Sequence, residues 1–100
     1  MKYFICYDIS SDAWREKLAR LLGEQGCKRV QKSVFLASDF SARELARLRQ
    51  LCLQRIVSHL SPDDSILCLP VENDLMTDVG WHGENLMLEA ALVNLPVKFL

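Results

Sequence analysis

An unbroken run of five apolar residues, Tyr3 to Tyr7, leads directly into the carboxylate of Asp8 near the start of the chain. Such a near-continuous β-branched and aromatic run is typical of a central strand with both faces covered. We therefore predict a strand over residues 2–7 that delivers Asp8 to one end of a sheet. A short polar turn follows, and the pattern then changes to a helical period.

The first helical pattern begins after Ser10 and Ser11, either of which can cap a helix through its hydroxyl group. Gly26 is typical of the residue that ends a helix in a left-handed conformation. Between these ends, the apolar residues recur every three or four positions and form one stripe: Trp14, Leu18, Leu21 and Leu22.

The second helical pattern covers residues 42–59. Ser41 and Glu44 match a capping box, in which each side chain accepts a hydrogen bond from the backbone N–H of the other residue. The apolar stripe consists of Leu45, Leu48, Cys52, Ile56 and Leu60, and the outer positions include Arg43, Arg47, Arg49 and Arg55.

Two other segments are predicted to be extended. Residues 65–69 suit a buried strand, which Pro70 is expected to end. Residues 28–36 alternate between a polar face, on which Phe35 is an exposed aromatic ring, and a core-like face. The core-like face carries Val30, Val34 and Leu36, but Lys32 interrupts it. This interruption indicates a kink, or a switch between two strands.

The order of these elements predicts an α+β fold, namely a ferredoxin-like βαββαβ sandwich with an antiparallel sheet. That domain covers residues 1–71. Residues 72–100 are predicted to be a C-terminal extension of the same domain, which begins with a polar loop over residues 72–83. Residues 86–92 suit a helix or an edge strand, and residues 97–100 suit a short strand. The extension is therefore either a strand exchanged between protomers or a tail that docks a partner.

The length and hydropathy of the chain limit its class. One hundred residues, half of them hydrophobic, suffice for one domain with a thin core, so self-association into a homo-oligomer is expected. No apolar run reaches the roughly 18 residues that a membrane span requires. Polar residues also interrupt the N-terminal segment too early for a signal peptide. We therefore expect a cytoplasmic protein with no membrane partner.

The net charge of −1 conceals two oppositely charged regions. Residues 15–55 carry ten lysines and arginines against four acids, whereas residues 61–100 carry seven acids against Lys98 alone. A basic region can attract phosphates even when the whole chain is nearly neutral. This favours a nucleic-acid contact within residues 15–55, although charge runs are more often simply solvated surface.

The cysteines and histidines indicate no separate metal centre or catalytic group. The cysteines are widely spaced and contain no Cys-x-x-Cys pair, so we expect them to be core thiols: Cys6, Cys27, Cys52 and Cys68. His59 ends a predicted helix and His82 lies in a predicted loop. Neither has a nearby partner in sequence that would activate it for catalysis.

The residues alone leave two interpretations of Asp8. Its carboxylate can accept hydrogen bonds from the backbone ahead of the first helix, which is a purely structural role. Alternatively, it can bind Mg²⁺ or Mn²⁺, since such ions often take one or two carboxylates and complete their shell with water and phosphate oxygens. One aspartate makes a poor metal site, but two that meet in a symmetric dimer make a plausible one.

Three pieces of the sequence together resemble a known family. They are Tyr7-Asp8-Ile9, then Arg15 and Lys17 with Leu18, and then Arg29-Val30-Gln31-Lys32-Ser33-Val34-Phe35. Their order and spacing across about residues 2–71 are similar to those of Cas2, the small CRISPR-associated adaptation endonuclease. Two features depart from the family pattern. The segment from Leu36 to Asp39 stands where Glu-Gly is frequent, and the chain beyond Val71 is longer than a minimal member needs.

The resemblance implies a ferredoxin-like homodimer that cleaves single-stranded RNA or duplex DNA with Mg²⁺ or Mn²⁺. It implies that Asp8 binds the metal together with its counterpart in the other protomer. It also implies a role in activity for Tyr7, Asp8, Arg15, Arg29 and Phe35, and nucleic-acid contacts for Arg15, Lys17, Arg29, Lys32 and Ser33. The implied partners are RNA or duplex DNA and the spacer integrase of the CRISPR adaptation complex.

Two alternatives stand beside the nuclease hypothesis. The protein can be a non-catalytic, dimeric DNA-binding scaffold whose acidic tail docks the integrase, in which case Asp8 is dispensable. It can also be a related toxin-type ribonuclease with the same fold. The scaffold and nuclease hypotheses are compatible with each other.

Overall fold

The computed structural model describes residues 1–80 and 82. Its regular elements follow the predicted order: β1 (Lys2–Asp8), α1 (Asp12–Glu24), β2 (Lys28–Gln31), β3 (Val34–Ala37), α2 (Ala42–Arg55) and β4 (Ser65–Val71). Two 3₁₀ helices complete the description, η1 (Val57–His59) and η2 (Asn73–Asp78). The predicted elements over residues 86–92 and 97–100 lie outside the described residues.

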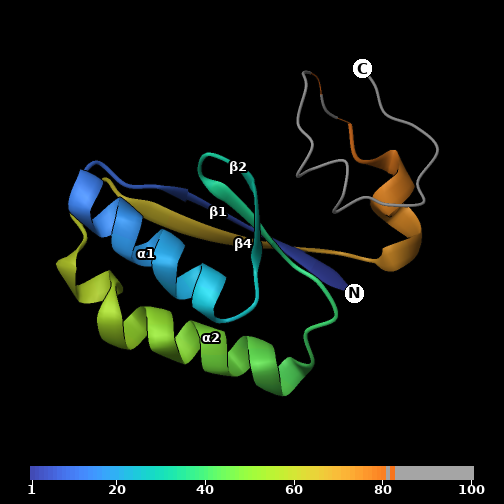
Figure 1. Ribbon diagram of the computed structural model, residues 1–100, viewed down its shortest axis with the longest axis horizontal. Coiled ribbons are helices and arrows are strands. Elements are labelled where there is room, and N and C mark those ends of the chain that lie inside the picture. The colour runs from blue at the N-terminus through green and yellow to red at the C-terminus, as the bar shows by residue number, and fades with distance from the viewer. Residues whose placement is uncertain (81, 83–100) are drawn as a thin grey trace.

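The four strands form one antiparallel sheet in the order β2-β3-β1-β4, with α1 and α2 side by side on one face (Figure 1). This confirms the ferredoxin-like α+β prediction and the central position of β1. The last residue of β1, Asp8, is paired with Ser65, the first residue of β4. The sheet therefore delivers Asp8 to one of its ends, as the sequence predicts.

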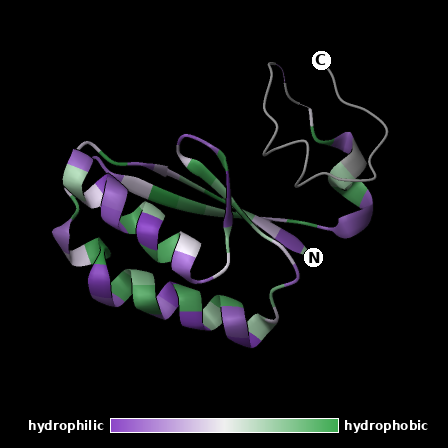
Figure 2. Cartoon of the chain, viewed as in Figure 1, coloured by the Kyte–Doolittle hydropathy of each residue, from purple (hydrophilic) through white to green (hydrophobic). Residues whose placement is uncertain are grey.

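Successive side chains of β1 point to opposite faces of the sheet, and each face has its own apolar cluster. Ile5, Tyr7 and Ile9 are buried in the main core, which they form with the apolar stripes of α1 and α2. Apolar and polar residues alternate along both helices (Figure 2), and the buried residues of this core include Leu18 and Leu22 of α1 and Leu48 of α2. On the other face, which we call the open face, Met76 packs against a second cluster that includes Val30 and Leu36.

The helix ends form as their capping residues dictate. Ser11 accepts a hydrogen bond from the N–H of Trp14, and Ser41 and Glu44 form the predicted capping box. Because the backbone and hydroxyl of Ser41 hydrogen-bond to it, the Glu44 carboxylate has a lowered pKa. Gly26 has φ of 94°, a left-handed conformation that glycine adopts without a steric penalty.

The structure corrects two predictions about helical segments. The helix predicted over residues 42–59 ends at Arg55 and is followed by the 3₁₀ turn η1. The prediction was too long because the apolar period of the sequence continues through both elements. The loop predicted over residues 72–83 contains η2, which is too short to show a helical period. Its Met76 is buried on the open face of the sheet.

Residues 28–36 lie in two strands, β2 and β3, with the turn between them at Lys32, which confirms the switch that the sequence indicated. Two other predictions about the strands need correction. Phe35 is not an exposed ring, because its face of the hairpin packs under the helices and leaves it 4% exposed. Pro70 does not end the last strand, because β4 is at an edge and tolerates a residue without N–H.

All four cysteines are free thiols. Cys27 is buried in the main core and Cys52 and Cys68 pack against it, in agreement with the prediction of core thiols, whereas Cys6 is half-buried on the open face. Burial raises the pKa of the Cys27 thiol to about 11, so this thiol is unreactive at neutral pH. Within the described residues, no helix is long and apolar enough to cross a membrane.

Candidate nucleic-acid and metal site

Asp8 is exposed at the end of β1, on the open face of the sheet. Side chains alternate along a strand, and since Ile5, Tyr7 and Ile9 point into the main core, Asp8 points the opposite way. Two leucines of β4 on this open face are also exposed, Leu67 by 58% and Leu69 by 49%. The carboxylate therefore shares its face with a patch of uncovered apolar surface.

The chemistry of Asp8 fits one ligand of a hard divalent cation. Its carboxylate forms no hydrogen bond or ion pair with any residue of the described part of the chain, so its oxygens are available. Among those same residues, however, no group of three or more potential metal ligands gathers at one place. One chain thus offers a single carboxylate, which suits an ion only if other oxygens come from outside the described chain.

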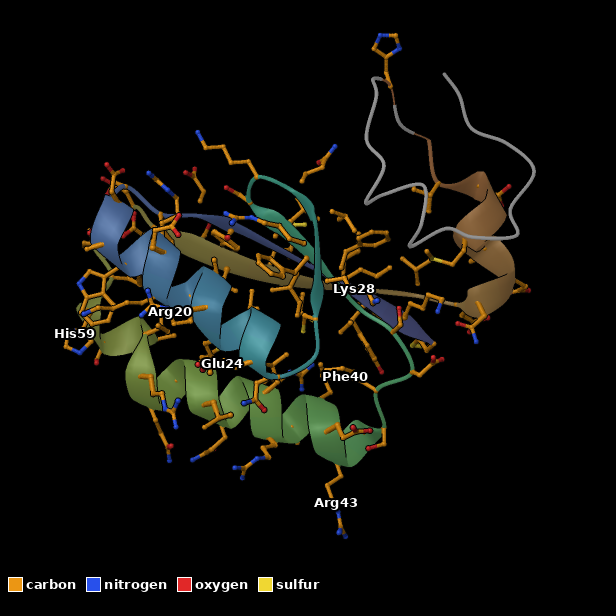
Figure 3. The ribbon with its side chains drawn as sticks, viewed as in Figure 1. Arg20, Glu24, Lys28, Phe40, Arg43 and His59 are labelled. Carbon is orange, nitrogen blue, oxygen red and sulfur yellow. The ribbon has the colours of Figure 1, made fainter. Side chains whose placement is uncertain are left out.

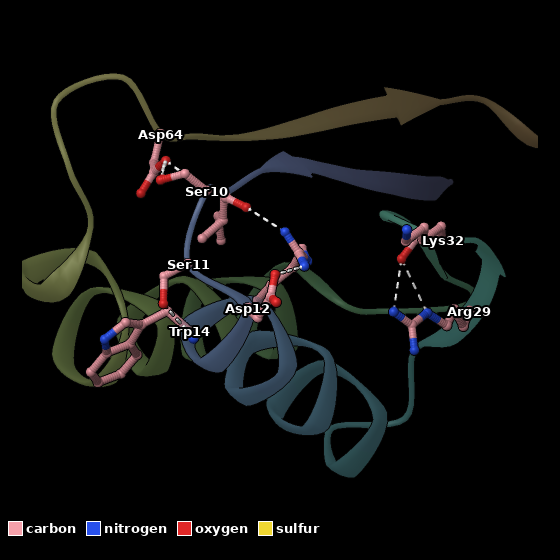
Figure 4. A network of polar contacts seen from close by, with 9 residues as sticks. Ser10, Ser11, Asp12, Trp14, Arg29, Lys32 and Asp64 are labelled. Atoms are coloured by element: carbon pink, nitrogen blue, oxygen red, sulfur yellow. Dashed lines mark hydrogen bonds and ion pairs between the residues drawn. The ribbon is translucent and has the colours of Figure 1, made fainter.

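The loop after Asp8 is held by two side chains from elsewhere (Figure 4). Arg15 donates a hydrogen bond to the carbonyl oxygen of Ile9 at 3.0 Å and forms an ion pair with Asp12. Asp64 accepts hydrogen bonds from the N–H and hydroxyl of Ser10, at 2.9 and 3.1 Å. The guanidinium of Arg15 is therefore engaged within its own chain, and the loop beside Asp8 has a defined shape.

Tyr7, Phe35 and Arg29 form one cluster on the helix side of the sheet. The rings of Tyr7 and Phe35 are stacked with centroids 6.2 Å apart, and the Arg29 guanidinium lies 5.5 Å from the Phe35 centroid. Burial raises the pKa of the Tyr7 hydroxyl, and the charge of Arg29 partly opposes that rise. The hydroxyl oxygen is buried without a hydrogen bond of normal geometry to any described residue. The two rings thus belong to the core behind Asp8.

Arg29 also shapes the turn that carries Lys32 and Ser33. Its guanidinium donates two hydrogen bonds to the carbonyl oxygen of Lys32, at 2.8 and 3.2 Å. The carbonyl oxygen of Ser33 accepts a hydrogen bond from the N–H of Tyr7 at 3.0 Å. This turn is therefore fixed beside the end of β1, with the Lys32 side chain exposed.

Lys17 lies apart from the other residues implied by the resemblance. Its ammonium lies over the ring of Trp14, 4.1 Å from the centroid, on the helix layer. The structure thus brings Tyr7, Asp8, Arg15, Arg29, Lys32, Ser33 and Phe35 to one end of the sheet, and it leaves Lys17 on another surface.

Asp64 is the residue of this region that sequence reasoning missed. It stands in the polar turn Ser61-Pro62-Asp63-Asp64, where an aspartate is expected to bond only its own turn. Its second oxygen does so, accepting from the N–H of Ser61 at 3.0 Å. The contact with Ser10 crosses 54 residues of sequence, and no local pattern indicates it.

Comparison with known proteins places these features in a family. The family model for CRISPR associated protein Cas2 matches residues 1–79. A CRISPR-associated endoribonuclease Cas2 of Aeropyrum pernix is 38% identical over 82 residues, which cover 82% of this chain and 85% of that protein. Another, of Korarchaeum cryptofilum, is 30% identical over 71 residues, covering 71% of this chain and 72% of that protein.

Two solved structures have the same arrangement of strands and helices. The hypothetical protein TT1823 from Thermus thermophilus superposes with a TM-score of 0.61 at 35% identity, covering 72% of this chain and 82% of that one. Cas2 of Streptococcus pyogenes gives a TM-score of 0.68 at 24% identity, covering 83% of this chain and 100% of that one. At this lower identity the likeness concerns the fold alone. The match across residues 1–79 favours the CRISPR family over a toxin-type ribonuclease.

Proposed function

The chain belongs to the family of CRISPR associated protein Cas2, and we propose that it is a divalent-metal-dependent endonuclease of the spacer-acquisition step. Its substrate is single-stranded RNA or duplex DNA, in which it hydrolyses phosphodiester bonds. The two relatives from Aeropyrum pernix and Korarchaeum cryptofilum are both named endoribonucleases, which supports this class of reaction.

The observation that carries the proposal is the position of Asp8 on the open face. The exposed leucines of β4 on that face, Leu67 and Leu69, provide apolar surface for a second copy of the chain. A homodimer through the open face would draw the two Asp8 carboxylates toward each other, because they lie on the surface that becomes buried. Two carboxylates meet the usual protein contribution to a Mg²⁺ or Mn²⁺ site.

The residues around Asp8 then have separate roles. The two Asp8 carboxylates would hold one divalent cation, which when bound neutralises phosphate charge and acidifies a water molecule. Lys32 and Ser33 contact the flanking phosphates, and Arg29 orients them through the carbonyl oxygen of Lys32. Arg15 fixes the loop next to Asp8 through the carbonyl oxygen of Ile9. These contacts are to the sugar–phosphate backbone, so they tolerate any sequence.

An Asp8→Asn variant tests the proposal. We expect it to bind labelled single-stranded RNA and duplex DNA as the wild type does in the presence of EDTA, and to lose Mg²⁺-dependent cleavage. Asp63→Asn removes another exposed carboxylate with no hydrogen bond in the described part of the chain, and it should cleave normally. Cleavage at the wild-type rate by Asp8→Asn would remove Asp8 from the mechanism.

A second candidate function is the non-catalytic scaffold for the spacer integrase. It is supported by the exposed lysines and arginines that form no ion pair among the described residues, because such cations suit phosphate binding more than catalysis. Under this function, Asp8→Asn leaves spacer acquisition in cells intact, whereas removal of residues beyond Val71 abolishes it. Normal co-purification of the integrase with the shortened chain would argue against a docking role for the tail.

A further inference from the structure

The basic surface of the helix layer is not neutralised by neighbouring acids. Residues 15–55 carry ten lysines and arginines. Within the described part of the chain the only ion pair is that of Arg15 with Asp12. Arg29 is engaged by a backbone carbonyl group. The remaining cations of α1 and α2 therefore keep their full charge available to an external anion.

Three of these cations line one groove between the two helices. A cavity of about 270 Å³ lies between α1 and α2, bounded by Lys17, Arg20 and Glu24 on one side and by Arg55 on the other. Figure 3 shows Arg20 and Glu24 between the helices, whereas Arg43 points away from them. Three positive charges and one acid thus line this groove, and all four residues are exposed.

Trp14 closes one end of the groove and fixes Lys17 there. Its ring is stacked on the imidazole of His59, with centroids 4.0 Å apart and an interplanar angle of 8°. Since His59 occupies one face of the indole, the ammonium of Lys17 at 4.1 Å must cover the other face. Both faces of Trp14 are therefore occupied. The ring acts as a support for Lys17, and no base can stack on it.

We propose that this groove, through Lys17, Arg20 and Arg55, binds the phosphate backbone of a nucleic-acid strand at a site separate from Asp8. The proposal rests on the function proposed above only in taking nucleic acid as the ligand. Guanidinium groups pair with phosphate oxygens through two parallel hydrogen bonds, which suits the two arginines.

The floor of the groove favours nucleic acid over an acidic protein. Leu21 and Ile56 line it but are 3% and 2% exposed, so they offer no apolar surface to an incoming side chain. Protein partners usually anchor through buried aromatic or aliphatic groups, whereas a phosphate backbone needs only accessible charge.

The groove and Asp8 lie on different layers but meet at one end of the fold. The groove belongs to the helix layer, and Asp8 faces the open side of the sheet. Trp14 is only six residues after Asp8, so the closed end of the groove lies at the same end of the sheet. A strand that passes around this end can contact both places. The groove would then contribute to affinity and not to the cleavage step.

The test compares two double variants of the full chain with the same loss of charge. Arg20→Gln with Arg55→Gln removes groove cations, and Arg43→Gln with Arg49→Gln removes cations of α2 that do not line the groove. Binding of a fluorescein-labelled single-stranded RNA and of a labelled DNA duplex is measured by anisotropy in EDTA at several salt concentrations. We expect the groove variant to bind more weakly and to reduce the slope of log K against log salt by about 1 per lost contact, with the control near wild type.

A third variant separates a loss of groove charge from a loss of folding, because it is expected to increase binding. Glu24→Gln removes the acid of the groove without disturbing its cations, so it should bind the same probes more tightly than the wild type. An unchanged slope in the groove variant, or an equal loss in the control variant, would overturn the proposal. Poly-glutamate that competes as strongly as the RNA would overturn it in favour of an acidic protein. Because EDTA removes cleavage from the assay, the groove can fail while the Asp8 mechanism stands.

Discussion

The Asp64 carboxylate accepts two hydrogen bonds from Ser10, one from its N–H at 2.9 Å and one from its hydroxyl at 3.1 Å. Asp64 also accepts a hydrogen bond from the N–H of Ser61, so one carboxylate joins the loop after β1 to the loop before β4. Asp8 and Ser65, the paired residues at that end of the two strands, lie directly beside these loops. Asp64 is therefore a positioning residue for the end of the sheet that carries Asp8.

Replacing Asp64 with asparagine should lower the melting temperature in a pH-dependent way. Hydrogen bonds from the N–H groups of Ser10 and Ser61 hold the pKa of Asp64 below its ordinary 3.8. A lowered folded-state pKa stabilises the fold above the unfolded-state pKa, and this stabilisation is lost as pH falls through the folded-state value. The difference in melting temperature between wild type and Asp64→Asn should thus be constant near neutral pH and shrink below about pH 4.

The neighbouring Asp63 provides the control for that experiment. It is exposed and has no hydrogen bond within the described residues, so Asp63→Asn should leave the melting temperature unchanged at every pH. A pH-independent difference for Asp64→Asn would show that its charge does not matter to the loop.

Replacing Arg15 with lysine should destabilise the fold although the charge is kept. A lysine lacks the planar fork that reaches both the Ile9 carbonyl and the Asp12 carboxylate. We expect a loss of about 1 kcal/mol in the free energy of unfolding in urea, the usual contribution of one hydrogen bond. Lys17→Gln, on the same helix, should change it little. If Arg15→Lys weakens nucleic-acid binding without changing stability, Arg15 contacts phosphate instead of the loop.

Introducing a charge into the open face should abolish the proposed dimer. Leu67→Glu places a carboxylate in apolar surface that the second copy would bury, and an unpaired buried charge costs several kcal/mol. Sedimentation equilibrium should then report a monomer. Leu53 on α2 is exposed to almost the same degree, 59% against 58%, but lies on the helix layer. Leu53→Glu should remain dimeric, and a dimeric Leu67→Glu would place the interface elsewhere.

Replacing Tyr7 with phenylalanine should leave both folding and cleavage intact. The Tyr7 hydroxyl is buried and forms no hydrogen bond of normal geometry with any described residue, so its removal should raise the free energy of unfolding by up to about 1 kcal/mol or leave it unchanged. The stack on Phe35 is kept. Tyr3→Phe, at the other end of β1, is the matched control. A folded Tyr7→Phe protein that no longer cleaves would show that the hydroxyl takes part in the chemistry.

The elements of the fold were predictable from the sequence where a local pattern fixes them. The capping box at Ser41, the left-handed Gly26 and the central strand ending at Asp8 each follow from residues next to one another. The exposure of Phe35 was predicted wrongly, because the polar residues around it hide which face of the hairpin packs against the helices. The burial of Met76 depends on the sheet beneath η2, which no short pattern shows.

The candidate site was predictable only in part, because some of its contacts depend on tertiary packing and not on a local pattern. The motif residues gather at the end of the sheet because strands β1 and β3 carry them to neighbouring positions. Arg15 and Arg29 donate hydrogen bonds to backbone carbonyl groups because of the geometry of their loops, which the sequence does not show. The contact of Asp64 with Ser10 depends in the same way on tertiary packing. Likewise, Lys17 shares a groove with Arg55 only because α1 and α2 lie side by side.

The stoichiometry of metal binding tests the central claim, that two copies of Asp8 share one divalent cation. Mn²⁺ binding to the dimeric full-length protein can be counted by titration with electron paramagnetic resonance, which detects free Mn²⁺. We predict one high-affinity Mn²⁺ for every two chains in the wild type and none in Asp8→Asn, with Asp63→Asn like the wild type. One Mn²⁺ for each chain, or unchanged binding in Asp8→Asn, would contradict the shared site.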